Sequence, residues 1–312
     1  MLGWFAGRSG AGGAPVPSAN TSVVAATTTT SAPITPPSSD SSAAPSKASP
    51  CVARDPGGGA LRYAVVWGAV TCDGAAAPED GYLPLETWFE TDGSSRVILE
   101  VADLGRVELA PSTRLRILPA KGPDSARPGQ KNEHRLELDH GTLNARIDAP
   151  PRLFIVETKA AAAVDLGCAY TLEVGEDGSG LLRVGKGEVA LETSSGRAAV
   201  VHRGEVCETR VGAGAGTPFS VTSTPRFRRA LSAWDFEHGS LDDVIGAATK
   251  EDTAGLVRAI DRASTRSDRE KLVKKLDDLS AGPSATERDG VLDGERSALD
   301  AYRSRLAKAP IR

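Results

Sequence analysis

The sequence predicts a mainly β protein with a disordered N-terminal tail and a small α-helical region at its C-terminal end. Between residues 134 and 210, short apolar stretches such as LFIVE and EVALE are each closed by Gly or Asp-Gly, which is typical of strands joined by tight turns. The first 50 residues are nearly uncharged and rich in Ala, Ser, Thr and Pro. After residue 226, apolar residues recur at helical spacing instead.

Composition narrows the class of protein. The 312 residues allow about two domains, and 40% hydrophobic residues are enough to form at least one core. Aromatic residues make up only 4%, which together with 33 Gly and 20 Pro indicates a sizeable unstructured portion. A net charge of −4 gives no basic footprint, so nucleic acid is not an expected partner.

Residues 1–60 are predicted to form a disordered tether rich in Ala, Gly, Ser, Thr and Pro. The segment Ala6–Pro50 carries few charges and cannot bury enough apolar area to offset the entropy of ordering it. A stalk beside a membrane and a plain tail both fit this composition. The opening run MLGWF is too short for a signal peptide or a membrane span, so we expect any membrane segment to precede Met1.

Residues 61–210 are predicted to form the β domain. The stretch Leu61–Cys72 has strand composition, and Asp92-Gly93 is a hairpin signal followed by apolar residues at alternate positions, Val97, Leu99 and Val101. The polar segment Lys121–Arg135 is the longest interruption and is predicted to be a loop.

A short pattern recurs within this domain. It consists of an apolar residue, two others, Gly, any residue and a second apolar residue, and Gly in that slot allows the chain to turn with a positive φ. We therefore expect strand, corner and strand at each copy, arranged as stacked β coils or as hairpins of a two-sheet sandwich; the irregular spacing favours stacked coils with loops. The copies lie at 102–107, 138–143, 164–169, 184–189 and 201–206.

Three blocks of the β domain carry a family resemblance. The runs ETDGSSRVILEVADLGRVELAPSTRLRIL, HGTLNARIDAPPRLFIVETKAAAAVDLGCAYTLEV and GLLRVGKGEVALE, in this order, resemble the extracytoplasmic domain of FecR-like regulators. Those are bacterial membrane proteins whose periplasmic β domain reads a signal and whose cytoplasmic end controls a sigma factor. The resemblance covers roughly Tyr63 to Arg210. The chain departs from the usual Thr-Pro and Gly-Thr turns, with Thr158-Lys159 and Gly167-Cys168 in their places.

Residues 211–225 are predicted to be a linker and residues 226–312 an α-helical region. Ser240 with Asp243 and Ser267 with Glu270 have capping-box spacing. Apolar stripes follow the second pair, and three to five short helices are expected; the stripes fit contacts inside a small bundle or a groove for a partner. They consist of Leu272, Val273, Leu276 and Leu279, and of Leu299, Tyr302 and Leu306.

The four cysteines form no Cys-x-x-Cys pair and no zinc-type spacing. In a chain that resembles an exported domain, an even number of cysteines favours two disulfides, Cys51 with Cys72 and Cys168 with Cys207. The sequence leaves the other pairings open, as well as four buried reduced thiols.

No pattern predicts a catalytic residue, a cofactor site or a metal site. The run Gly180 to Lys186 fits part of a phosphate-loop motif, but Gly187 replaces the required Ser or Thr and a strand follows, so we interpret it as a β corner. The four histidines are scattered, and no cysteine-hydrolase signature surrounds Cys168.

The resemblance implies a non-catalytic sensing or regulatory module in the periplasm or cell envelope. Such a module would bind a protein partner, for which an open sheet edge is the natural surface, and would reach the membrane only through a segment that this sequence does not contain. A structural or adhesive envelope scaffold without signalling output is the alternative.

Overall fold

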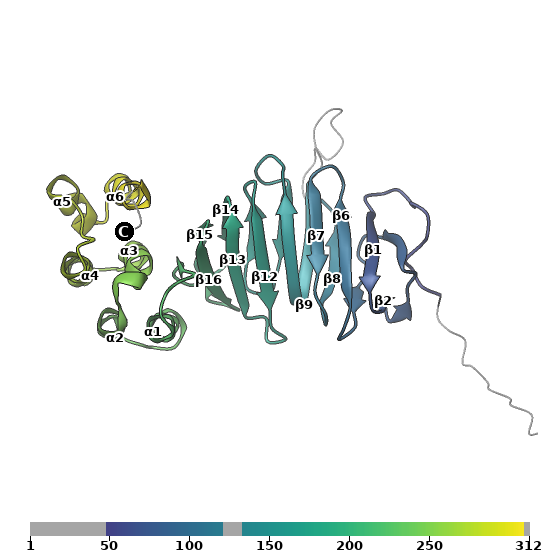
Figure 1. Cartoon of the computed structure of the whole chain (residues 1–312), viewed down its shortest axis with the longest axis horizontal. Coiled ribbons are helices and arrows are strands. Elements are labelled where there is room, and N and C mark those ends of the chain that lie inside the picture. The colour runs from purple at the N-terminus through teal and green to yellow at the C-terminus, as the bar shows by residue number, and fades with distance from the viewer. Residues whose placement is uncertain (1–47, 121–132, 309–312) are drawn as a thin grey trace, which may run out of the picture. The chain divides into compact units, whose positions relative to one another are not determined.

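The computed structural model describes residues 48–120 and 133–308, all within one compact unit, Ser46–Arg312. A β domain is followed by α-helices, which confirms the predicted fold class (Figure 1). Most of the predicted disordered tail and of the predicted loop Lys121–Arg135 lies outside the described residues.

The β domain consists of two sheets, which we call sheet A and sheet B. All pairs in sheet A are antiparallel, and β17 and β18 both pair with β16 at one end. Its order is β4 (Asp80–Leu83), β1 (Leu61–Trp67), β6 (Arg96–Val101), β7 (Gly105–Leu109), the second half of β9 (His134–Ile147), β12 (Ala169–Val174), β13 (Gly180–Lys186), β16 (Glu205–Arg210), β17 (Gly214–Ala215) and β18 (Phe219–Ser220).

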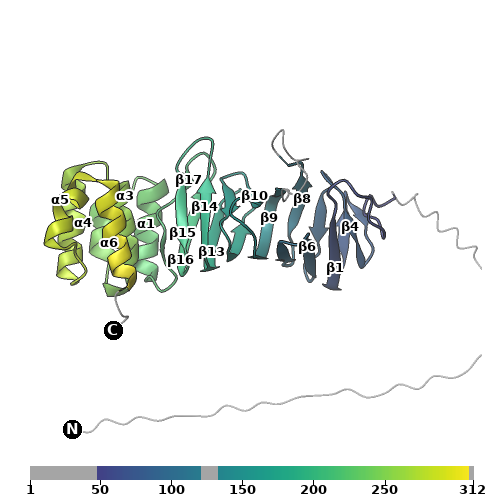
Figure 2. The ribbon, with the colours of Figure 1, turned by 90° about the horizontal axis from the view of Figure 1, so that it is seen from above.

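In sheet B, as in sheet A, the strands lie side by side roughly in the order of the sequence (Figure 2). The two sheets share β9. Its one parallel pair, among the strands that the structure describes, joins β9 to β10. The order is β3 (Ala75–Ala76), β2 (Val70–Cys72), β5 (Phe89–Thr91), β8 (Arg114–Leu118), the first half of β9, β10 (Phe154–Glu157), β11 (Ala162–Asp165), β14 (Glu188–Glu192) and β15 (Ala199–His202).

A continuous apolar core joins the strands of the two sheets. As the alternation predicts, Val97, Leu99 and Val101 of β6 are all buried. Tyr63 and Phe89 come from different sheets, and their rings pack with centroids 4.8 Å apart. The β domain is therefore a two-sheet arrangement with one interior.

The recurring glycine has a positive φ in all five copies of the pattern, at Gly105, Gly141, Gly167, Gly187 and Gly204. At four of them the chain passes from one sheet to the other, whereas Gly105 begins the second strand of the hairpin β6–β7 within sheet A. The predicted corners are thus confirmed.

The longest strand, β9, contains one of these corners. Its first half pairs with β8 and β10 in sheet B, and its second half pairs with β7 and β12 in sheet A. The change occurs at Gly141, whose φ is 101°. The Thr142 N–H donates to the Thr113 hydroxyl at 3.0 Å, so a side chain satisfies a backbone group where the ladder changes partners.

Two segments with the composition of a tether or a linker carry β structure. Val52 forms an isolated bridge with Tyr82, so the chain pairs with the β domain before residue 61. The predicted linker 211–225 contains β17 and β18, which extend sheet A beyond β16. Composition alone predicts loops here, because both segments are rich in Gly, Pro and small residues.

The described part of the C-terminal region contains six α-helices, more than the three to five predicted. Ser240 caps α2 as expected, but α4 is capped by Thr265 rather than by Ser267. None of the described helices is long and apolar enough to span a membrane. The helices are α1 (Pro225–Phe236), α2 (Leu241–Ala247), α3 (Thr253–Arg262), α4 (Arg266–Asp278), α5 (Ala285–Asp293) and α6 (Arg296–Lys308).

The helices share a second core with the end of sheet A. Val206 of β16 and Phe219 of β18 pack with the predicted stripe residues, including Leu272 and Leu276. Arg258 of α3 donates two hydrogen bonds to Glu205 of β16, at 2.9 and 2.7 Å. The stripes are thus core contacts, and the helical region closes one end of sheet A.

Replacing Gly141 by Ala is expected to lower the free energy of unfolding by more than about 3 kcal/mol, because the positive φ strains a residue with a Cβ and crowding adds to that strain. The new Cβ would lie 2.4 Å from the Cα of Thr113. Urea unfolding followed by circular dichroism measures the loss.

Gly204→Ala is the matched control, since Gly204 fills the same slot with φ 80° but has open space around the added Cβ. We expect a loss of about 1 kcal/mol from backbone strain alone. Equal losses in the two variants would contradict the role given to the contact with Thr113.

Candidate functional site

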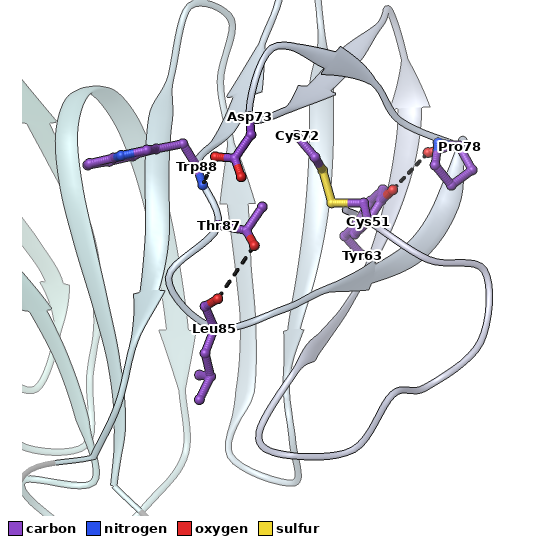
Figure 3. The surroundings of a disulfide bond; sticks show 8 residues. All are labelled: Cys51, Tyr63, Cys72, Asp73, Pro78, Leu85, Thr87 and Trp88. Atoms are coloured by element: carbon purple, nitrogen blue, oxygen red, sulfur yellow. Dashed lines mark hydrogen bonds between the residues drawn. A yellow bond between two sulfur atoms is a disulfide. The ribbon is translucent and has the colours of Figure 1, made fainter. Parts of the chain in front are cut away.

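Cys51 and Cys72 form a disulfide that ties the segment before β1 to strand β2 (Figure 3). Their Cα atoms lie 5.9 Å apart, and both residues are buried. Beside the bond, the Tyr63 hydroxyl donates to the carbonyl of Pro78 at 3.1 Å. Burial raises the pKa of Tyr63 to about 12, so its phenol stays protonated as a donor. The disulfide thus cross-links the segment before β1 to β2, and we call it the N-terminal staple.

Cys168 and Cys207 do not form the second predicted disulfide; both are free, buried thiols. The strand register explains why. Cys207 of β16 pairs with Leu182 of β13, and Leu182 pairs with Leu172 of β12. Cys168 lies four residues before Leu172, so it is two strands and four residues away from Cys207. With strand spacings of about 4.8 Å and a rise of about 3.3 Å per residue, this separation exceeds the reach of a disulfide.

Neither free thiol is suited to nucleophilic chemistry. The Cys168 thiol donates to the Asp165 carboxylate at 2.5 Å, and burial together with this hydrogen bond raises its pKa. Burial likewise raises the pKa of Cys207. Because the thiolate is the reactive form, both groups stay inert near neutral pH.

Two of the four histidines each contact a carboxylate, and they do so on different strands. His140 contacts Asp139 at 3.0 Å on β9, and His202 contacts Glu188 at 2.9 Å across β15 and β14. Within residues 48–120 and 133–308, no group of three or more His, Cys, Asp or Glu could hold a metal ion. The run Gly180 to Lys186 forms strand β13, and Gly187 follows with φ 73°, which confirms the β corner.

The outer surface of sheet A carries a concentration of positive charge. Arg106 of β7 lies directly opposite Arg146 of β9, and Arg183 of β13 lies two strands further on. Arg203 follows at the corner before β16 and lines the same hollow. We call these four residues the arginine face; all four are exposed, and none forms an ion pair with another described residue.

A shallow hollow of about 670 Å³ lies among these arginines. Small residues contribute to its lining, including Ala169, Gly185 and Gly204. The Thr171 hydroxyl donates to the side-chain oxygen of Asn144 at 2.6 Å, which leaves the Asn144 amide hydrogens available as donors.

Among the described residues, one carboxylate lines the hollow, and it is already paired. Glu108 accepts two hydrogen bonds of 2.7 Å from Arg96, which hold its pKa below the ordinary value, and the charges of Arg146 and Arg106 act in the same direction. Five guanidinium groups and one carboxylate therefore line the hollow, an excess of four positive charges on a chain whose net charge is −4.

The sequence alone does not predict this face. The arginines are far apart in the chain, and only the strand pairing brings them together. A signal was present in each strand, because Arg106, Arg146 and Arg183 alternate with buried residues in GRVEL, NARI and LLRV and must therefore point away from the core. Which strands are neighbours could not be deduced from that alternation.

The open edge expected for a partner is small in this structure. Edge strand β4 is bridged by Val52, and β3 has two residues. At the other end of sheet B, β15 has four residues and exposes Val200. Short and covered edges are a common means of preventing unwanted strand pairing.

Comparisons with known proteins gave weak similarity only. No family model matches the chain, and no curated protein matches it. Two crystal structures of a "putative anti-sigma factor" from Parabacteroides distasonis, at 1.65 and 2.50 Å resolution, align with a TM-score of 0.32 and 16% identity. The alignment covers 41% of this chain and 57% of that protein. Similarity at this level does not establish a common fold or function.

We expect the oxidised protein, unfolded in denaturant without reductant, to show two reactive thiols, and four after reduction. Counting with a chromogenic disulfide reagent makes this measurement. No reactive thiol before reduction would restore the Cys168–Cys207 pair, and four would eliminate the Cys51–Cys72 bond.

Removing the disulfide through Cys51→Ala/Cys72→Ala is expected to lower the free energy of unfolding by about 3 kcal/mol, because the bond closes a loop between residues 21 positions apart in the unfolded chain. Urea unfolding with and without reductant tests this. The wild type should lose stability on reduction and the variant should not; a variant as stable as the oxidised wild type would contradict the N-terminal staple.

Proposed function

We propose that this chain is a non-catalytic, FecR-like sensing or regulatory module that acts outside the cytoplasm and binds a protein partner. The Cys51–Cys72 bond carries the proposal, because structural disulfides persist in oxidising compartments such as the periplasm and are rare in the cytoplasm. The two remaining cysteines are buried, protonated thiols and supply no reactive group.

The blocks that resemble FecR-like domains support the same interpretation. They comprise the end of β5 through β8, the second half of β9 through β12, and β13 with β14. These strands form the middle of both sheets and include four of the five recurring glycines, Gly204 being the exception. The resemblance therefore involves the residues that specify the β domain, and partner binding in envelope signalling is the function it suggests.

An epitope tag at the C-terminus, introduced at the native locus, tests the proposal. We expect the tagged product outside the cytoplasm, in the membrane fraction, with Cys51 and Cys72 oxidised. Cell fractionation gives the location, and a gel shift with a maleimide reagent after acid trapping gives the number of reduced thiols.

The control is a Cys51→Ala/Cys72→Ala product made in the same way, which should show the same location and no change in gel shift on reduction. A cytoplasmic product with all four cysteines reduced would overturn the proposal. A product outside the cytoplasm but free of the membrane would support the proposed location. It would favour an envelope scaffold without signalling output over a regulatory module.

A further inference from the structure

We propose that the arginine face, Arg106, Arg146, Arg183 and Arg203, binds an acidic, extended segment of a protein partner. The inference rests on the proposed function, since it assumes a protein partner, and it adds the surface and the chemistry of recognition. Four observations support it: like charges held together, the extent of the face, the apolar groups beside it and the scarcity of acidic residues in the chain's own tail.

The strand register places like charges side by side. Arg106 lies directly opposite Arg146, and like charges in such cross-strand pairs destabilise a sheet. Glu100 also lies opposite Arg106, but it forms an ion pair with Arg62, at 3.3 Å. Glu108 is occupied by Arg96. Among the described residues the four arginines thus form no ion pair of their own, and an anionic ligand would supply that pairing.

The face is too wide for one small anion. It extends from β7 across β9 and β12 to β13, which at about 4.8 Å per strand is roughly 14 Å. A single carboxylate or phosphate cannot contact both ends. A ligand that engages the whole face needs several negative groups along an extended backbone, and the planar guanidinium groups suit bidentate pairing with carboxylates.

Exposed apolar side chains border the charges. Trp67 is 52% exposed, and its ring lies under the Arg96 guanidinium at 5.2 Å. Val221, which is 37% exposed, lines the opposite part of the hollow. A peptide can offer acidic and apolar side chains together, whereas a phosphate polymer offers no apolar group. The combination therefore favours a protein segment.

The chain's own N-terminal segment is a poor occupant. Residues 1–47 contain a single acidic residue, Asp40, so they cannot neutralise four arginines. We therefore assign the face to an acidic segment of a partner protein and not to residues 1–47. A second copy of this chain remains a separate outcome of the test.

The test uses a fluorescein-labelled peptide of about twelve residues, long enough in extended form to cross the face, with glutamates alternating with serines and leucines. Fluorescence anisotropy measures its affinity for the whole chain at about 0.05 M and about 0.3 M salt, because exposed charge pairs are screened at the higher value. A peptide with serines in place of the leucines measures the apolar contribution, and polyphosphate represents a phosphate polymer.

Arg106→Gln/Arg146→Gln is expected to weaken binding about tenfold at low salt, since each lost exposed charge pair contributes a fewfold change. Its unfolding temperature should equal or exceed that of the wild type, because a repulsive pair has been removed. Should this variant unfold, Arg183→Gln/Arg203→Gln provides the same test on the other side of the hollow. The control Arg54→Gln/Lys274→Gln removes the same charge at exposed positions outside the hollow and should bind as the wild type does.

Three outcomes would overturn the inference. Equal peptide binding by the arginine variants and the control would mean that the face is not the site. Tighter binding of polyphosphate, with no effect of the leucines, would assign the face to a phosphate polymer. A dimer in size-exclusion chromatography that the arginine variants abolish would make a second copy the occupant.

Photo-crosslinking in cells separates this inference from the proposed function. A benzophenone amino acid at Thr171 reports on the hollow, and the same group at Val200 reports on the edge of sheet B. A protein crosslinked from Val200 and not from Thr171 would overturn the inference that the arginine face is the binding site. It would still support the proposal that the chain binds a protein partner. Crosslinking from Thr171 that Arg106→Gln/Arg146→Gln abolishes, together with peptide binding, supports both.

Discussion

The passage of β9 from sheet B to sheet A is the constraint on which the β domain depends. One strand of 14 residues serves two sheets, so its backbone groups must change partners at Gly141 without being left unpaired in the interior. Hydroxyls resolve this: Thr113 accepts from the Thr142 N–H, and the Thr113 N–H donates to the Thr91 hydroxyl at 2.8 Å. A buried threonine pair thus replaces ladder hydrogen bonds at the crossing.

The sequence predicted these corners well because their signal is local. A glycine between two apolar residues requires only that its own φ be positive, and all five glycines fulfil this. The pattern could not tell a change of sheet from a hairpin, since both need the same turn. Gly105 forms a hairpin and Gly141 a crossing; the difference lies in which strands they meet, and that is decided by contacts far along the chain.

Pairing between strands that are far apart in the sequence also explains what the sequence did not predict. The Cys51–Cys72 bond joins nearby residues, whereas the pairing of Cys168 with Cys207 depended on a register that places them two strands apart. The arginine face arose from the same register, which brought residues of β7, β9 and β13 together. Alternation fixes the side of the sheet on which each residue lies but not its neighbours.

Closure of the sheet ends limits where another chain could add a strand. The second core and the Glu205–Arg258 pair, whose side chains are 14% and 10% exposed, close the β16 end of sheet A. Val52 bridges its other edge strand, and the edge strands of sheet B are short. Strand addition therefore has little room, since it needs a run of free backbone groups. A rigid sheet face keeps its side chains in fixed register instead, and on sheet A that register brings Arg106, Arg146 and Arg183 together, as the proposed acidic ligand requires.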